Sequence, residues 1–191
     1  MLDRDVKNAL SRQVPNLAKN KIRGEIRKKF LETKNQMISE FMSNPITQEI
    51  MAGSTGPNIS GTLNGVSNLF AFIGFDRGAQ PIMPILELLE KTELIYKKNL
   101  SKPKIGVEFE VTMPTKEQIF AITPLPYETG RSWAEGIERG LSGLGYLIRK
   151  NAGRSGSAIQ TRVKVRKGKF QNVPYISALL NKYAKKFKDL K

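Results

Sequence analysis

The apolar positions of residues 1–44 recur at intervals of three and four, and lysines and arginines occupy the opposite side. This spacing predicts one long amphipathic N-terminal helix, which Pro15 either interrupts or starts. The helix should end where Asn44 meets Pro45, because a residue before proline is disfavoured in helical geometry. The apolar positions are Leu17, Ile22, Ile26, Phe30, Leu31, Met37, Ile38, Phe41 and Met42.

This predicted helix is long for one that packs only on its own small domain. Its apolar stripe is more than a small sheet can cover, so we expect part of it to contact another protein subunit. The expected subunit contacts are Ile26, Phe30, Met37 and Phe41. We accordingly divide the chain into an N-terminal helical extension, residues 1–44, and a single domain, residues 45–191.

Two later segments alternate between apolar and polar residues, which is the pattern of a half-buried β-strand. They are residues 105–113 and residues 159–166. Residues 68–75 are apolar on both faces and rich in aromatic side chains, which predicts a central strand. Residues 118–123 are predicted to return as the antiparallel partner of residues 105–113.

Short helices are predicted between these strands, and a longer one closes the chain. Glycine, serine, threonine and asparagine mark loops at residues 52–65 and 151–157. The predicted helices are residues 46–51, 81–90, 131–140 and 175–190. The expected fold class is α+β, with one small, mostly antiparallel sheet, helices on one face and a projecting N-terminal helix.

Composition narrows the chemistry that this fold could carry. The 191 residues include 32 Lys and Arg against 17 Asp and Glu, a formal net charge of +15, and contain neither Cys nor His. Thiolate nucleophiles, Ser-His-Asp triads and Cys or His metal sites are therefore excluded. We expect a non-enzymatic protein without a cofactor.

The positive charge is concentrated toward the C-terminus. Residues 131–191 carry a net +12, whereas residues 43–130 carry a net −2. A basic row follows the strand predicted at 159–166, and three interpretations stay open: a solvated strand face, electrostatic contact with protein, and contact with nucleic acid. The row consists of Arg162, Lys164, Arg166, Lys167 and Lys169.

Carboxylates offer a weaker functional signal. Glu108 and Glu110 share one face of the strand predicted at 105–113, and with Asp76 they resemble the acidic cluster of a metal-dependent nuclease. That pattern requires a lysine two residues after an acid, a position that Glu110 fills after Glu108. An ion-paired or solvated face is the preferred interpretation, and metal-dependent cleavage lost on Glu108→Gln or Glu110→Gln would contradict it.

Two further features favour structural roles. The loop at 52–65 lacks the Gly-Lys-Ser/Thr ending of a phosphate-binding loop. Trp133, the only tryptophan, lies on a helical apolar stripe and is predicted to be a core residue. No segment is apolar enough for a membrane span or a leader peptide, so we expect a protein that works in a reducing compartment without a membrane.

The C-terminal half shows an order of small motifs that resembles neck and tail-completion proteins of tailed bacteriophages. The motifs are SWAEGIERGLSGLGYLI (132–148), RSGSAIQ (154–160), TRVKVR (161–166) and NVPYISALLNKYAKKF (172–187), with ISGTLN (59–64) upstream. The resemblance covers roughly residues 55–187 and includes no catalytic signature.

The resemblance implies a structural virion protein that forms a homo-oligomeric ring at the head–tail junction or upper tail, around the passage for DNA. Its partners would be other copies of the chain and neighbouring neck or tail proteins. Such a protein would be assembled in the host cytoplasm. The charge pattern agrees, because a head-to-tail ring joins two different surfaces of one chain.

Two classes of function stay open beside each other: the ring-forming virion protein, and a basic accessory protein that binds nucleic acid. In the ring, Glu108 and Glu110 would meet Arg162, Lys164 and Arg166 either within one chain or, as we prefer, between adjacent subunits. Salt separates the two classes, since phosphate binding weakens steeply with salt and an apolar subunit interface does not.

Overall fold

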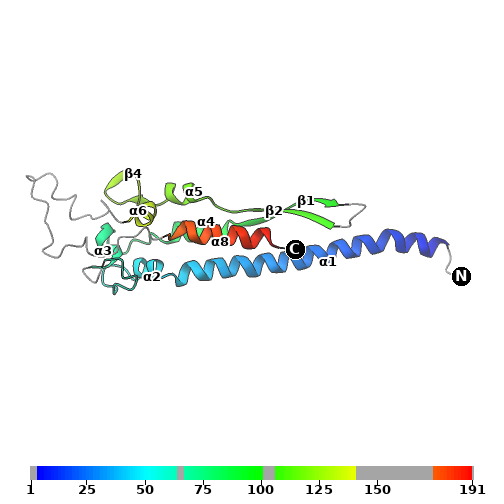
Figure 1. The fold of residues 1–191 in the computed structure, drawn as a ribbon, viewed down its shortest axis with the longest axis horizontal. Coiled ribbons are helices and arrows are strands. Elements are labelled where there is room, and N and C mark those ends of the chain that lie inside the picture. The colour runs from blue at the N-terminus through cyan, green and yellow to red at the C-terminus, as the bar shows by residue number, and fades with distance from the viewer. Residues whose placement is uncertain (1–3, 64–66, 101–105, 141–173, 191) are drawn as a thin grey trace, which may run out of the picture.

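The computed structural model describes residues 4–63, 67–100, 106–140 and 174–190. The molecule is elongated along its first helix, α1, which runs from Arg4 to Ser43. At 1.5 Å per residue its 40 residues span about 60 Å. Figure 1 shows its N-terminal part extending beyond all other described elements.

The predicted long N-terminal helix is confirmed. It continues through Pro15 and ends at Ser43, where Asn44 begins helix α2, Pro45–Met51. The Asn44 side chain accepts a 2.9 Å hydrogen bond from the backbone N–H of Ile46. This N-cap satisfies an otherwise unpaired donor and makes the chain start a second helix in a new direction.

The remaining elements alternate short helices with short strands. Four of the predicted elements are confirmed: the helices at 81–90, 131–140 and 175–190, and the strand at 105–113. In order, the elements are α3 (Leu69–Ile73), α4 (Met83–Glu90), β1 (Glu93–Leu100), β2 (Gly106–Thr112), α5 (Lys116–Ala121), β3 (Pro124–Leu125), β4 (Glu128–Ser132), α6 (Trp133–Glu138) and α8 (Ile176–Lys188).

The described strands form two small antiparallel sheets of two strands each, β1 with β2 and β3 with β4. The fold class is α+β, as predicted, although the single expected sheet is divided. In the longer ribbon Tyr96 pairs with Phe109, and a bulge follows between Tyr96 and Lys98. Along β2 the apolar residues are half-buried and Glu108 and Glu110 are exposed, so the predicted alternation is confirmed.

The strand predicted at residues 68–75 is wrong, because this segment forms α3. The side chain of Asn68 accepts from the backbone N–H of Ala71, which caps the first turn. Gly74 ends the helix with φ 86°, a left-handed conformation that favours glycine. These start and stop signals outweighed the β-propensity of the aromatic residues between them.

The strand predicted at residues 118–123 is also wrong. This segment forms α5, which begins with a capping box between Thr115 and Gln118. In this box the Thr115 hydroxyl accepts from the Gln118 backbone, and the Gln118 side chain accepts from the Thr115 backbone. The partner of β2 is instead β1, a strand that the sequence did not predict.

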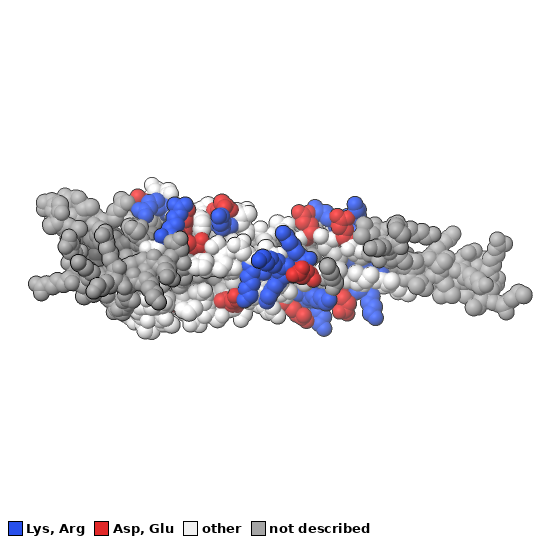
Figure 2. All heavy atoms as spheres, in the orientation of Figure 1, with Lys and Arg blue, Asp and Glu red and all other residues white. Residues whose placement is uncertain are grey.

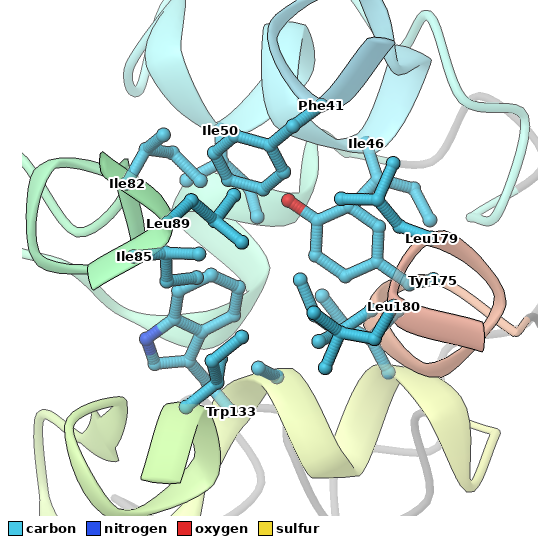
Figure 3. Packing of buried hydrophobic residues seen from close by; sticks show 14 of the residues in the cluster. Phe41, Ile46, Ile50, Ile82, Ile85, Leu89, Trp133, Tyr175, Leu179 and Leu180 are labelled. Atoms are coloured by element: carbon cyan, nitrogen blue, oxygen red, sulfur yellow. The ribbon is translucent and has the colours of Figure 1, made fainter. Parts of the chain in front are cut away.

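One hydrophobic core joins α1 to the rest of the chain. Figure 3 shows side chains of α1, α2, α4, α6 and α8 converging, with Phe41, Ile50, Leu89, Trp133 and Tyr175 among them. Trp133 is 1% exposed, so its predicted core role is confirmed. Residues 30–43 of α1 therefore belong to the same core as the domain predicted at 45–191, and the boundary expected at residue 44 does not separate two packed units.

Candidate functional site

The first part of α1 extends beyond the other described elements (Figure 1). Among the α1 side chains that the structure describes, residues 17–43, the first buried one is Phe30. Leu17 is 67% exposed and Leu31 is 46% exposed. Leu17 lies on roughly the opposite side of the helix from the buried Met37, as the 3.6-residue period requires. The projecting helix thus presents an apolar side chain to solvent.

Three of the four predicted subunit contacts on α1 lie in the chain's own core. Phe30, Met37 and Phe41 are each at most 5% exposed. Phe30 packs on Phe187 of α8 with ring centroids 5.5 Å apart. Because these side chains are covered by α8 and its neighbours, they have no surface left for a second subunit, and this corrects the interpretation of the sequence.

Ile26, the fourth of these residues, is half-buried and lines an open groove of about 680 Å³. The groove lies between α1, the β1–β2 ribbon and the end of α8. Its apolar lining is Ile26, Leu94, Val107, Phe109, Val111, Met113, Ala184, Phe187 and Leu190, and Glu108 and Lys188 add the charged groups. Sequence reasoning therefore identified one α1 position that remains next to an accessible apolar surface.

Glu108 and Glu110 are paired within the ribbon. Glu108 lies 3.3 Å from the ammonium of Lys98, and Glu110 forms a salt bridge with Lys97. Both bridges join β2 to β1 of the same chain and are about half exposed to solvent. The pairing predicted between these carboxylates and the basic strand stays a prediction. The residues of that basic row, Arg162, Lys164, Arg166, Lys167 and Lys169, lie outside the described residues, as do the predicted strand at 159–166 and loop at 151–157.

The solvent side of α8 carries the densest group of lysines in the described part of the chain. Lys182, Lys185, Lys186 and Lys188 are all exposed, within two turns of helix. Figure 2 shows basic side chains gathered in the middle of the drawn face, where α8 lies. The opposite side of α8 is buried in the core, so the helix presents only its charged face.

A carboxylate on α1 holds one edge of this lysine face. Lys182 Nζ lies 2.8 and 2.7 Å from the two oxygens of Glu40, and the Tyr183 hydroxyl donates to Glu40 at 2.8 Å. The Lys182 ammonium, with the Tyr183 hydroxyl, holds the pKa of Glu40 below its ordinary value. Burial and the neighbouring carboxylate raise the pKa of Tyr183 to about 12.

The loop after α2 is organised by a buried carboxylate. Glu49 is fully buried and accepts 2.7 Å hydrogen bonds from the backbone N–H groups of Ser60 and Leu69. The Asn68 side chain donates to the carbonyls of Gly53 and Gly56. Residues 52–63 form no regular element, as predicted, but these bonds fix their path.

The described parts of the chain contain no group of three or more acidic side chains placed to hold one metal ion. Asp76 lies in a turn closed by the backbone of Ala79, and Glu108 and Glu110 bind lysines. No helix within the described ranges has the length and apolar character to cross a bilayer.

Comparison with known proteins gives no relative: no protein-family model, no curated protein and no solved structure matches this chain.

The lysine face of α8 is the surface feature that sequence reasoning missed. The residues predicted to make basic contacts were Arg162, Lys164, Arg166, Lys167 and Lys169, and none of the α8 lysines was among them. The missing signal is present in the sequence, because the lysines recur at three- and four-residue spacing between the apolar positions.

Proposed function

We propose that this protein is a structural component of a tailed-phage virion, a ring-forming subunit of the neck or upper tail. The observations that carry the proposal are the N-terminal part of α1, which extends beyond the other described elements, and the exposed Leu17 on the same helix. A helix of this length without covering elements gains stability chiefly when a partner packs on it. The motif order in residues 55–187 supplies the phage context.

A ring built head to tail joins two different surfaces of one chain. The projecting helix provides one such surface. The chain also lacks His and Cys, so the commonest catalytic chemistry is excluded by composition. The proposed role is therefore assembly with other copies and with neighbouring virion proteins, without catalysis.

Mass measurement of the full chain in solution tests this proposal. We expect a closed oligomer of defined mass, seen as rings by electron microscopy, and a shift to smaller species in Leu17→Asp. Asn20→Asp, at another exposed position on α1, is the matched control and should leave the mass unchanged. A full chain that stays monomeric at all concentrations would contradict the proposal.

The accessory nucleic-acid-binding protein predicts different behaviour. Such a protein would remain monomeric, and its binding would weaken log-linearly with salt. A ring held by an apolar interface should keep its mass when the salt concentration is raised from about 0.05 to about 1 M. The added ions screen charges, and they do not weaken apolar contacts. The oligomer mass decides between these functions, because a ring subunit that also contacts DNA would show the same salt dependence of binding.

A further inference from the structure

We propose that the solvent-facing side of α8 is a binding surface for the phosphate backbone of double-stranded DNA. The surface consists of Lys182, Lys185, Lys186 and Lys188. This inference does not depend on the proposed ring, because a single copy of the chain presents the whole surface.

The first argument is the geometry of the lysines. Residues 182 to 188 rise about 9 Å along the helix axis, at 1.5 Å per residue. The phosphates of each strand recur about every 3.4 Å measured along the duplex axis, so a row of about 9 Å laid along that axis spans about three of them. A lysine ammonium suits such contacts, because it acts as a point charge and a phosphate contact does not involve recognition of a base.

The second argument is that most of this charge is left without a carboxylate. Lys182 is paired with Glu40, and Lys186 donates to the Gln36 amide at 3.2 Å. Within the residues that the structure describes, Lys185 and Lys188 have no carboxylate within salt-bridge distance. Asp189 is the one acidic residue of α8 and its C-cap, and Glu32 and Glu40 of α1 border the surface beside Lys186. The face therefore keeps a net positive charge.

The surroundings of the lysines favour duplex DNA over other anionic partners. The remaining exposed residues of α8 are Ala178 and Asn181, so no aromatic ring is available to stack unpaired bases. Protein interfaces are depleted in lysine and enriched in aromatic residues, the reverse of this face. Insertion of α8 into a membrane surface would require an exposed apolar side, and that side of α8 is buried in the core.

Salt-dependent binding of the full chain to a random-sequence 30-base-pair duplex tests the proposal, measured by fluorescence anisotropy. The variant Lys185→Gln/Lys188→Gln removes two cations from α8 and keeps residues with good helix propensity. The matched control, Arg77→Gln/Lys91→Gln, removes two cations at exposed positions outside α8. Both variants have the same net charge, so long-range attraction changes equally in the two.

We expect the α8 variant to lose about tenfold in affinity per phosphate contact at 0.1 M salt, and its log-log salt slope to fall by about 0.9 per contact. The control should keep the slope of the unmodified chain. Equal losses in both variants, or no duplex binding by the full chain, would overturn the proposal. Equally tight binding to poly-glutamate would overturn the assignment to phosphate.

Discussion

The buried hydroxyl of Tyr183 on α8 donates a 2.8 Å hydrogen bond to the carboxylate of Glu40 on α1. The same carboxylate accepts two contacts from Lys182, so it binds two consecutive residues of α8. Beneath this polar contact, Phe187 of α8 packs on Phe30 of α1. The contact between α1 and α8 thus combines apolar packing with a group of polar contacts at its edge, formed by Glu40, Lys182 and Tyr183. The strength of these polar contacts should depend on pH.

At acidic pH the contacts of Glu40 with Lys182 and Tyr183 should weaken. Because the pKa of Glu40 is lowered in the folded chain, its contribution to the free energy of unfolding is complete above the ordinary value of 4.5 and is lost as the pH falls through the folded value. The side chains of Glu40 and Lys182 are both more than a third exposed, so we expect at most about 1 kcal/mol. Urea unfolding of the unmodified chain and of Glu40→Gln should differ at pH 7 and converge at acidic pH. A difference that persists at low pH would show that the carboxylate charge is irrelevant.

At alkaline pH the hydroxyl of Tyr183 becomes the titrating group. Its raised pKa, about 12, means that its contribution is complete below the ordinary value of 10.0 and is lost as the pH rises toward 12. Tyr183→Phe should therefore flatten the fall in the free energy of unfolding between pH 10 and 11. Tyr175, whose pKa burial also raises, remains in both proteins and provides the common background. An identical pH profile in the two proteins would rule out this linkage.

The buried side chains of residues 30–43 of α1 should contribute to stability as part of the hydrophobic core. Met37→Ala removes a fully buried side chain and should lower the free energy of unfolding by about 2 to 5 kcal/mol. Leu31→Ala, on the exposed side of the same helix, should change it by less than about 0.5 kcal/mol. Chemical denaturation compares the two variants directly. Similar small effects in both variants would contradict the assignment of this part of α1 to the core.

Replacing Glu49 should loosen the loop after α2. Glu49→Gln removes one of two carboxylate oxygens that accept backbone N–H groups, and an amide N–H₂ cannot accept in its place. We expect a loss of about 1 to 3 kcal/mol, with faster proteolysis within residues 52–63. Glu32→Gln, at an exposed position on α1, is the matched control. Unchanged proteolysis in Glu49→Gln would show that the loop path does not depend on this carboxylate.

The ribbon carboxylates should contribute little by themselves. The salt bridges of Glu108 and Glu110 are about half exposed, so Glu108→Gln and Glu110→Gln should each change the free energy of unfolding by at most about 1 kcal/mol. Thermal unfolding measures this effect, and the oligomer mass of each variant shows whether the residues also serve assembly. An oligomer mass equal to that of the unmodified chain would show that these two carboxylates act only within the β1–β2 ribbon.

The spacing of apolar residues and the helix-capping residues explain which elements could be predicted from the sequence. Long helices with an apolar stripe, α1 and α8, and the strictly alternating β2 follow from periodicity alone. In α3 and α5, local caps decided the structure: Asn68 and Gly74 bound one segment, and Thr115 with Gln118 opens the other. Those signals were present in the sequence but were given less weight than aromatic and β-branched content.

The surfaces were harder to predict than the elements. Strand β1 lacks a regular alternation, because the bulge between Tyr96 and Lys98 shifts the register, so the lysines that pair with Glu108 and Glu110 were not anticipated. The burial of Met37 depends on helices far away in the sequence, which a helical period cannot reveal. Residue type identified the charged groups, but only the tertiary fold assigned their partners.

Lys34 on α1 donates to the backbone carbonyls of Glu90 and Thr92, the residues that end α4 and precede β1. The β1–β2 ribbon leaves the body at this junction and extends toward the same end of the molecule as the projecting part of α1. A force applied to either arm therefore reaches the body at a shared anchor. Because the Arg23 guanidinium of α1 also lies over the Tyr96 ring of β1, 4.1 Å from its centroid, the two arms should bend as one unit.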